Sequence, residues 1–495
     1  MEPINYSFSR NHYLFGKPKI KYWMKELPGY LLILELIGSS FNIVPVLVIP
    51  IFFGVLLLIF YFLIDRAYLV KIKNTLDFRL WFLLYILVCI VYAKIIGVDI
   101  FSFSLFRREF KFVFPFVFLI TYSSFLYSDE MKRRIIYSLF FISSFSLAWL
   151  MFGFLDPKYH NTRLYPFEGF MWEHVSGGPS IYLGPFITHS AAGGFYGTMT
   201  LLFLGIYVVC RNYVNRSLFF LAIIVNTVCL CLTDSRAFMF STALISGFTG
   251  LFYLIKSRNP KNSIIKPFQI IAAPVIILII LATFHFIEGH GGHLDIANIL
   301  NKGLQSSIAE SKKSDARLYY SYLRFYLWKI AIEDLEKSPL IGVGPSRFDD
   351  DSRVLATIPK HDIDKGIISL PTSSKSKDKY FQIPFVRVNI GQFVAHTDQH
   401  PHNVYLDVLS EGGVALFSIF IFMYFRMLTS IYCERNSNLP ENFALLNGVI
   451  YSFSGVGIAS FFGNNLLTVI PMMTIFSIVS LLAGSQRLPS QMIKD

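Results

Sequence analysis

The sequence predicts an all-α protein that crosses a membrane many times and carries one large loop outside the bilayer. Hydrophobic residues make up 54% of the chain and charged residues only 15%, whereas a soluble domain carries about 25% charged residues. The apolar residues form continuous blocks instead of the alternation over about 10 residues that is typical of β-barrel spans. A single long polar stretch, at about 288–402, interrupts these blocks.

Each apolar block is close to the roughly 20 residues that a helix needs to span a bilayer. About twelve spans are expected on this basis, at 28–42, 44–64, 80–98, 110–128, 135–154, 190–210, 217–233, 236–255, 267–287, 403–430, 443–462 and 465–484. The chain therefore divides into an N-terminal transmembrane region at 1–287, a large loop containing helices at 288–402, and a C-terminal transmembrane region at 403–495.

Basic residues in the short connections predict the orientation. Clusters of Lys and Arg lie at 66–79, 132–134, 211–216 and 256–266. Because short cytoplasmic loops are enriched in Lys and Arg, these connections and both termini are expected to be cytoplasmic, with the large loop on the outer side. Arg107 and Arg108 are the exception, and they indicate either a misplaced span or a site for an anionic head group.

The net charge of +12 does not indicate nucleic acid binding, because the excess lies in these short connections, where it meets anionic lipid. All five cysteines lie in or beside apolar runs, so no disulfide framework is expected. His396, Asp398, His400 and His402 are close in sequence but lack the spacing of a zinc site, so we expect no metal and no cofactor.

Arg236 stands at the outer end of the expected span 236–255. Asp234 and Ser235 before it are good N-cap residues. An Arg in the first turn of a helix is disfavoured by the helix dipole, and charge at a membrane boundary is a functional hypothesis by default. The alternative is an interfacial Arg that pairs with Asp234.

The stretch 314–347 predicts an amphipathic helix that Pro339 ends. Arg317 and Arg324 are seven residues apart and share a face of this helix, and Trp328 is placed to stack on Arg324. One interpretation is a helix lying on the bilayer with its cations at head-group level. The other is a set of side chains that bind an anionic substrate.

His400-Pro401-His402-Asn403 lies where the large loop re-enters the membrane. Histidine exchanges a proton near neutral pH, which makes His402 a candidate acid–base or substrate-binding residue. The alternative is that His402 and Asn403 only cap the following helix.

Taken together, several blocks resemble the O-antigen ligase and polymerase family of membrane glycosyltransferases, whose multi-span fold is called GT-C. The blocks are Gly184-Pro185-Phe186 through His189 with Gly193-Gly194, Ser235-Arg236, Arg324 with Trp328, Pro339 to Gly344 with Phe348, and His402 to Leu406 with Glu411-Gly412-Gly413. Their order, with one long outer loop between Arg236 and His402, is more specific than any single block. The first 150 residues match the family only in hydropathy.

The resemblance implies a metal-independent, inverting enzyme of the bacterial inner membrane with its large loop in the periplasm. The donor would be a glycan linked to polyprenyl diphosphate, and the acceptor lipid A–core or a growing glycan. Catalytic roles would fall to His402, Arg236 and Arg324. Substrate binding is expected of Arg317, Trp328, Asn403, His400 and His189.

Two alternatives to a ligase stay open. One is a polymerase of the same family that extends the carrier-linked chain. The other is a polysaccharide or lipid transporter, which typically has internal repeats and charged or broken helices near the bilayer midplane; the expected spans contain only Glu35 and Lys94 as clear charges. The segment 348–395 is longer than the family pattern, and Ser373 to Lys379 within it reads as a flexible excursion.

Overall fold

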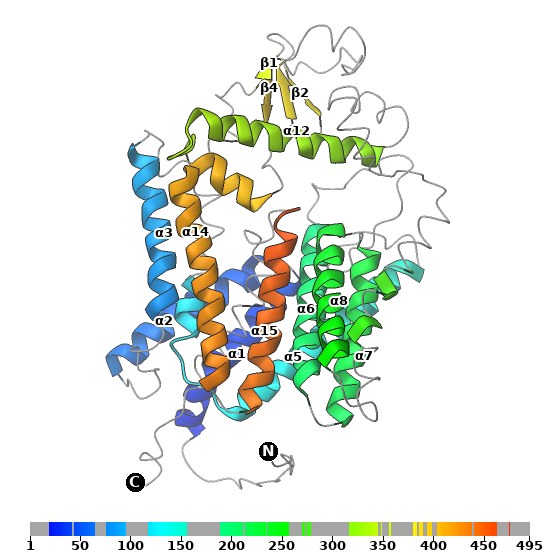
Figure 1. Ribbon diagram of the computed structural model, residues 1–495. Coiled ribbons are helices and arrows are strands. Elements are labelled where there is room, and N and C mark those ends of the chain that lie inside the picture. Colours follow the sequence, from blue (N-terminus) through cyan, green and yellow to red (C-terminus); the bar gives the residue numbers. More distant parts are fainter. Residues whose placement is uncertain are drawn as a thin grey trace.

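A bundle of long helices forms the body of the computed structural model (Figure 1). The structure describes residues 19–41, 44–64, 76–95, 117–155, 189–210, 213–233, 235–256, 270–272, 275–277, 279, 316–344, 348, 356–357, 380–383, 386–389, 394–397, 403–437, 440–462 and 475. Its bundle helices are α1 (Lys19–Phe41), α2 (Val44–Ile64), α3 (Leu76–Ile95), α5 (Asp129–Leu155), α6 (His189–Val209), α7 (Tyr213–Leu232), α8 (Arg236–Lys256), α14 (Val404–Ser437) and α15 (Pro440–Ala459).

These helices coincide with nine of the expected spans. Agreement is closest for α2 and α8, whereas α1 begins nine residues before the expected start at residue 28. Within the expected span at 110–128 the described residues are helical only over 117–122, and residues 123–128 form a turn before α5, so this span is not reproduced as expected. The expected spans at 267–287 and 465–484 lie largely outside the described residues. Within the described part, three helical stretches are long and apolar enough to cross a membrane, namely Ala191–Val209, Arg236–Ile255 and Val404–Thr429.

Helices α6 and α15 form the centre of the bundle, and they run antiparallel. Gly205 on α6 faces Gly448 on α15 so closely that a Cβ at residue 205 would lie 2.6 Å from the Gly448 Cα. Next to this crossing, Asn447 Nδ2 donates to the Gly205 carbonyl at 2.7 Å, and Ser452 Oγ donates to the Thr198 carbonyl at 2.9 Å. Small residues and interhelical hydrogen bonds are the usual means of packing helices where lipid removes the hydrophobic driving force.

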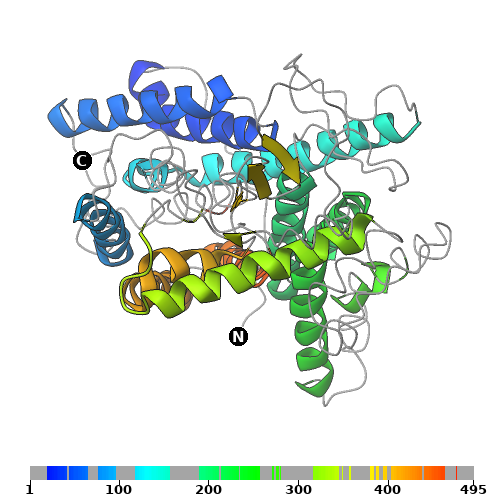
Figure 2. The ribbon, with the colours of Figure 1, turned by 90° about the horizontal axis from the view of Figure 1, so that it is seen from above.

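Helix α12 (Ala316–Lys337) belongs to the large loop and lies across one end of the bundle (Figure 1). From above, it passes over α14 at one end and reaches toward α6 and α8 at the other (Figure 2). The expected helix therefore exists, and it ends two residues before Pro339, which cannot continue a helix without losing a hydrogen bond.

A small antiparallel sheet corrects the all-α expectation. Its strands are β1 (Ala356–Thr357), β2 (Tyr380–Ile383), β3 (Val386–Asn389) and β4 (Val394–Thr397), in the order β1-β4-β3-β2. The sheet lies beyond α12, on the side away from the bundle (Figure 1). Strands of four residues or fewer give a much weaker period-2 signal than a membrane span gives in hydropathy, so this element was missed.

Candidate functional site

The candidate site lies at the end of the bundle where four helix termini meet. Because α6 and α15 are antiparallel, the start of α6 and the end of α15 share this end. The start of α14 joins them, since Val404 N donates to the Ser460 carbonyl at 3.1 Å just after α15 ends. The start of α8 joins through Ser235, which packs on Gly193 in the first turns of α6. These are the termini that carry the predicted residues His189, Arg236 and Asn403.

Arg236 is the first residue of α8, and its side chain is exposed. Ser235 before it is buried, and its carbonyl accepts the first helical bond from Met239 N at 3.0 Å, as an N-cap residue does. A Cβ at Gly193 would overlap the Ser235 side chain, so only glycine allows α8 to begin this close to α6. This contact fixes the position of the Arg236 backbone.

Asn403 caps α14. Its side-chain oxygen Oδ1 accepts from Tyr405 N at 3.0 Å and from Leu406 N at 3.1 Å, and its carbonyl accepts from Asp407 N at 2.9 Å. The side chain is only 6% exposed. The capping interpretation is therefore confirmed for Asn403, and its Oδ1 is engaged by the helix before any substrate arrives.

Two consecutive phenylalanines after α15 link the helices of Arg236 and Asn403. The ring of Phe461 lies 4.2 Å from that of Tyr405 on α14, and the ring of Phe462 lies 5.5 Å from that of Phe240 on α8. Tyr405 is also tied to α15, because its hydroxyl donates to the Gly457 carbonyl at 2.8 Å. Sequence reasoning did not single out this aromatic bridge, which only the return of α15 to the site end creates.

Helix α12 covers this end of the bundle and contains Arg317, Arg324 and Trp328 (Figure 2). Trp328 is partly buried, and Leu327, Ile330, Ala331 and Asp334 on the same helix are buried. This pattern is that of a helix packed on protein along one face. The side chains of Arg317 and Arg324 lie outside the described part, so the predicted stacking of Trp328 on Arg324 stays a prediction.

Helix α14 breaks at Gly413, where φ is 61° and ψ is −169°. In an unbroken helix the carbonyls of Ser410 and Glu411 would accept from the amides of Val414 and Ala415. The break separates these groups, and each needs another partner because buried backbone groups are nearly always hydrogen-bonded.

The loop that follows α12 supplies all four partners. Val343 N donates to Ser410 O at 2.9 Å, Gly344 N to Glu411 O at 2.8 Å, Val414 N to Pro339 O at 2.9 Å, and Ala415 N to Leu340 O at 3.1 Å. We call the paired segments 339–344 and 410–415 the α12–α14 clasp. Two blocks that were noted separately in the sequence thus form one structural unit.

Glycine is required on both sides of the clasp. Gly342 has a φ of 66°, and a Cβ there would overlap the Glu411 backbone, while a Cβ at Gly413 would overlap that of Leu340. Two side chains reinforce the contact: Glu411 Oε1 accepts from Phe348 N at 3.2 Å, and the Tyr92 hydroxyl of α3 donates to the Gly342 carbonyl at 3.1 Å. The clasp therefore joins α12, α14 and α3.

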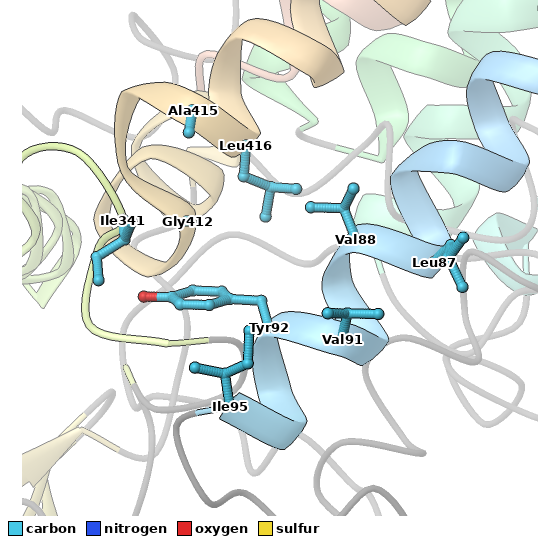
Figure 3. Close-up of a pocket in the computed structure, with 9 residues that line it drawn as sticks. All are labelled: Leu87, Val88, Val91, Tyr92, Ile95, Ile341, Gly412, Ala415 and Leu416. Atoms are coloured by element: carbon cyan, nitrogen blue, oxygen red, sulfur yellow. The ribbon is translucent and has the colours of Figure 1, made fainter.

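An open apolar groove of about 330 Å³ lies between α3 and the clasp (Figure 3). It is lined by Leu87, Val88, Val91, Tyr92, Ile95, Ile341, Gly412, Ala415 and Leu416. Figure 3 shows the Tyr92 ring reaching across from α3 toward Ile341 and the kink of α14. The Tyr92 hydroxyl is the polar side-chain group among these lining residues, and it is already bonded to the Gly342 carbonyl. The groove is therefore suited to bind a hydrocarbon chain and not a sugar or a phosphate.

Not every predicted residue can be placed. His400 and His402 lie outside the described residues, and of His189 only the backbone, at the first residue of α6, is described. Among the described side chains, no group of three or more His, Cys, Asp or Glu has the arrangement of a metal site. The described geometry brings together the starts of α8 and α14, and α12 lies across the same end of the bundle.

The sequence was also compared with known proteins and protein families. No curated protein matches the chain. The family model described as O-antigen ligase matches residues 218–421, which run from α7 through α8 and α12 to the first half of α14. The match supports the resemblance seen in the sequence, and over this stretch the chain is similar to the O-antigen ligase family.

Proposed function

We propose that this protein transfers a glycan from a polyprenyl diphosphate carrier to a hydroxyl of lipid A–core at the periplasmic face of the bacterial inner membrane. The observation that carries the proposal is the family match over 218–421, because that stretch contains the three elements that meet at one end of the bundle. The same match favours glycan transfer over transport, the alternative that hydropathy leaves open.

The leaving group in such a reaction is a lipid diphosphate, which is stable as an anion and needs no general acid. It does need its growing negative charge stabilised. Arg236 at the start of α8 and Arg324 on α12 are suited to this role, because guanidinium groups make bidentate, charge-assisted bonds to phosphate oxygens. Two arginines would replace the magnesium ion that many phosphate-handling enzymes use.

His402 precedes the cap residue Asn403 and is proposed to orient or deprotonate the acceptor hydroxyl. Attack by that hydroxyl on the sugar carbon forms the new glycosidic bond as the bond to the diphosphate oxygen breaks, and the configuration inverts. Arg317, Trp328, His400 and His189 would contact the sugar or the diphosphate. Asn403 would act through the position of His402.

The test replaces Arg236, Arg324 and His402 singly by Ala and follows transfer with purified protein and lipid-linked donor. Loss of one preorganised charge-stabilising donor typically lowers kcat by about 10²–10³, and that drop is expected for both arginine variants. Arg216→Ala is the matched control, since Arg216 bonds Tyr207 at 3.1 Å near the end of α6 and so lies at the opposite end of the bundle. Full transfer in all three site variants would refute the mechanism.

A polymerase is the second candidate, because the family model spans enzymes of both kinds and the same donor chemistry serves both. The surface glycan of a deletion strain separates them. Core that lacks any polymer, with carrier-linked polymer accumulating, supports the ligase. Core that carries a single repeat unit supports the polymerase.

A further inference from the structure

The α12–α14 clasp ties the end of α12 to the bundle, in addition to the packing of α12 against α14. Four backbone hydrogen bonds cross it, and the bonds of Glu411 to Phe348 and of Tyr92 to Gly342 brace it. The other end of the segment 404–412 is tied to the end of α15 by the bond from Val404 N to the Ser460 carbonyl. The position of α12 therefore depends, through the clasp, on the position of α14 and, through α14, on that of α15.

The length of α12 makes the proposed site sensitive to this joint. Arg324 lies thirteen residues before Lys337, the last residue of the helix, which at 1.5 Å per residue places it about 20 Å from the clasp. A rotation of about 10° at the joint would displace the Arg324 backbone by roughly 3 Å. Misplacement by about 1 Å can reduce a rate by about 10²-fold where the reacting groups must be aligned.

We propose that the clasp is a positioning device for glycan transfer, and that Gly342, Gly413 and Glu411 are positioning residues that act through α12. This inference rests on the proposed function. The glycines permit the backbones to interlock, and Glu411 holds the outgoing loop through its bond to the Phe348 amide. None of the three needs to touch the donor or the acceptor.

Variants of Glu411 distinguish a role of its side chain in positioning the loop from a requirement for its negative charge. Its Oε1 accepts a hydrogen bond from a backbone amide at 3.2 Å, and the side-chain oxygen of Gln can also accept such a bond, although a weaker one than a carboxylate makes. Glu411→Gln is therefore expected to keep most of the transfer activity, whereas Glu411→Ala removes the acceptor and loses it. Equal loss in both variants would show that the negative charge is required and would overturn the assignment for Glu411.

The glycines are tested by Gly413→Ala and Gly342→Ala in full-length protein in lipid nanodiscs. Gly247→Ala on α8 is the matched control, because a Cβ at Gly247 would meet no atom within 4 Å. Each variant is assayed for kcat and KM. Spin labels report the geometry directly, one at Lys329 on α12 and one at Ile255 on α8, both exposed; in this series the native cysteines are replaced by alanine.

The clasp variants are expected to lower kcat by at least about 10-fold, to raise KM less, and to shift or broaden the distance between the labels. Gly247→Ala should match the wild type in all three. Unchanged distance and unchanged kcat in Gly413→Ala would overturn the proposal. If the glycine variants do not fold, the comparison of Glu411→Gln with Glu411→Ala tests the proposal. A wild type without transfer activity would refute the proposed function, while the label distances would still report whether the clasp holds α12.

Discussion

Asn403 offers the clearest separation of a structural from a substrate-binding role. Replacing it with Ala removes the side-chain oxygen that accepts from the amides of Tyr405 and Leu406 at 3.0 and 3.1 Å. The site is only 6% exposed, so water cannot easily replace the oxygen. Loss of such a cap typically costs about 0.5–2 kcal/mol, and a buried amide left unsatisfied costs about 1–3 kcal/mol. We therefore expect the free energy of unfolding to fall by about 1–2 kcal/mol.

The assay is unfolding in mixed micelles with a denaturing detergent, followed by tryptophan fluorescence. Asn403→Asp and Asn403→Ser keep an acceptor oxygen at the cap position and should stay within about 0.5 kcal/mol of the wild type. If Asn403→Ala is as stable as the wild type, the reasoning about the cap is refuted.

The same three variants separate two roles in transfer. If Asn403 acts only through the cap that positions His402, the Asp and Ser variants keep transfer activity and the Ala variant loses part of it. If the amide nitrogen of Asn403 donates to the substrate, Asn403→Asp loses transfer while remaining stable, because a carboxylate has no N–H to donate.

Two further predictions concern the bundle. Gly448→Leu would place a side chain against Leu202 and Ile206 where α15 crosses α6, and it should lower the free energy of unfolding by about 1–3 kcal/mol or more; normal stability in a micelle unfolding assay would contradict the close crossing. Glu35 on α1 is fully buried, and among the described residues neither of its carboxyl oxygens has a hydrogen-bond partner. Glu35→Leu should therefore raise the free energy of unfolding by about 1–3 kcal/mol, and a drop in the same assay would indicate that the carboxyl serves a purpose the static structure does not show.

Hydropathy predicted the positions of several long helices because the hydropathy of neighbouring residues adds up along an apolar run. Each span needs roughly 20 apolar residues whatever its neighbours are, and α2 and α8 accordingly begin where the sequence indicated. The helix α12 was also predictable, from apolar spacing and from Pro339 as its stop. The sheet β1–β4 was not, because pairing of short strands depends on partners distant in sequence and on side-chain packing.

The candidate site was predictable only in part. Arg236 is a candidate on sequence because a charge at the end of an apolar run is costly, and Asn403 is one because it directly precedes such a run. The two amide bonds to its side chain confirm that Asn403 caps α14, whereas substrate binding by Asn403 stays a prediction. The aromatic bridge from Phe461 and Phe462 carried no sequence signal, since aromatic residues are abundant throughout the chain.

The sequence by itself indicated a helical membrane protein that resembles the O-antigen ligase family, with a polar loop between Arg236 and His402. Those properties follow from composition and from the linear order of motifs. Only the tertiary structure decided that Pro339 to Gly344 interlocks with the break at Gly413. That contact joins segments some seventy residues apart in the chain through backbone hydrogen bonds. Because backbone atoms are the same in every residue, such bonds cannot be predicted from residue types. Only the glycines that allow the two backbones to approach are visible in the sequence.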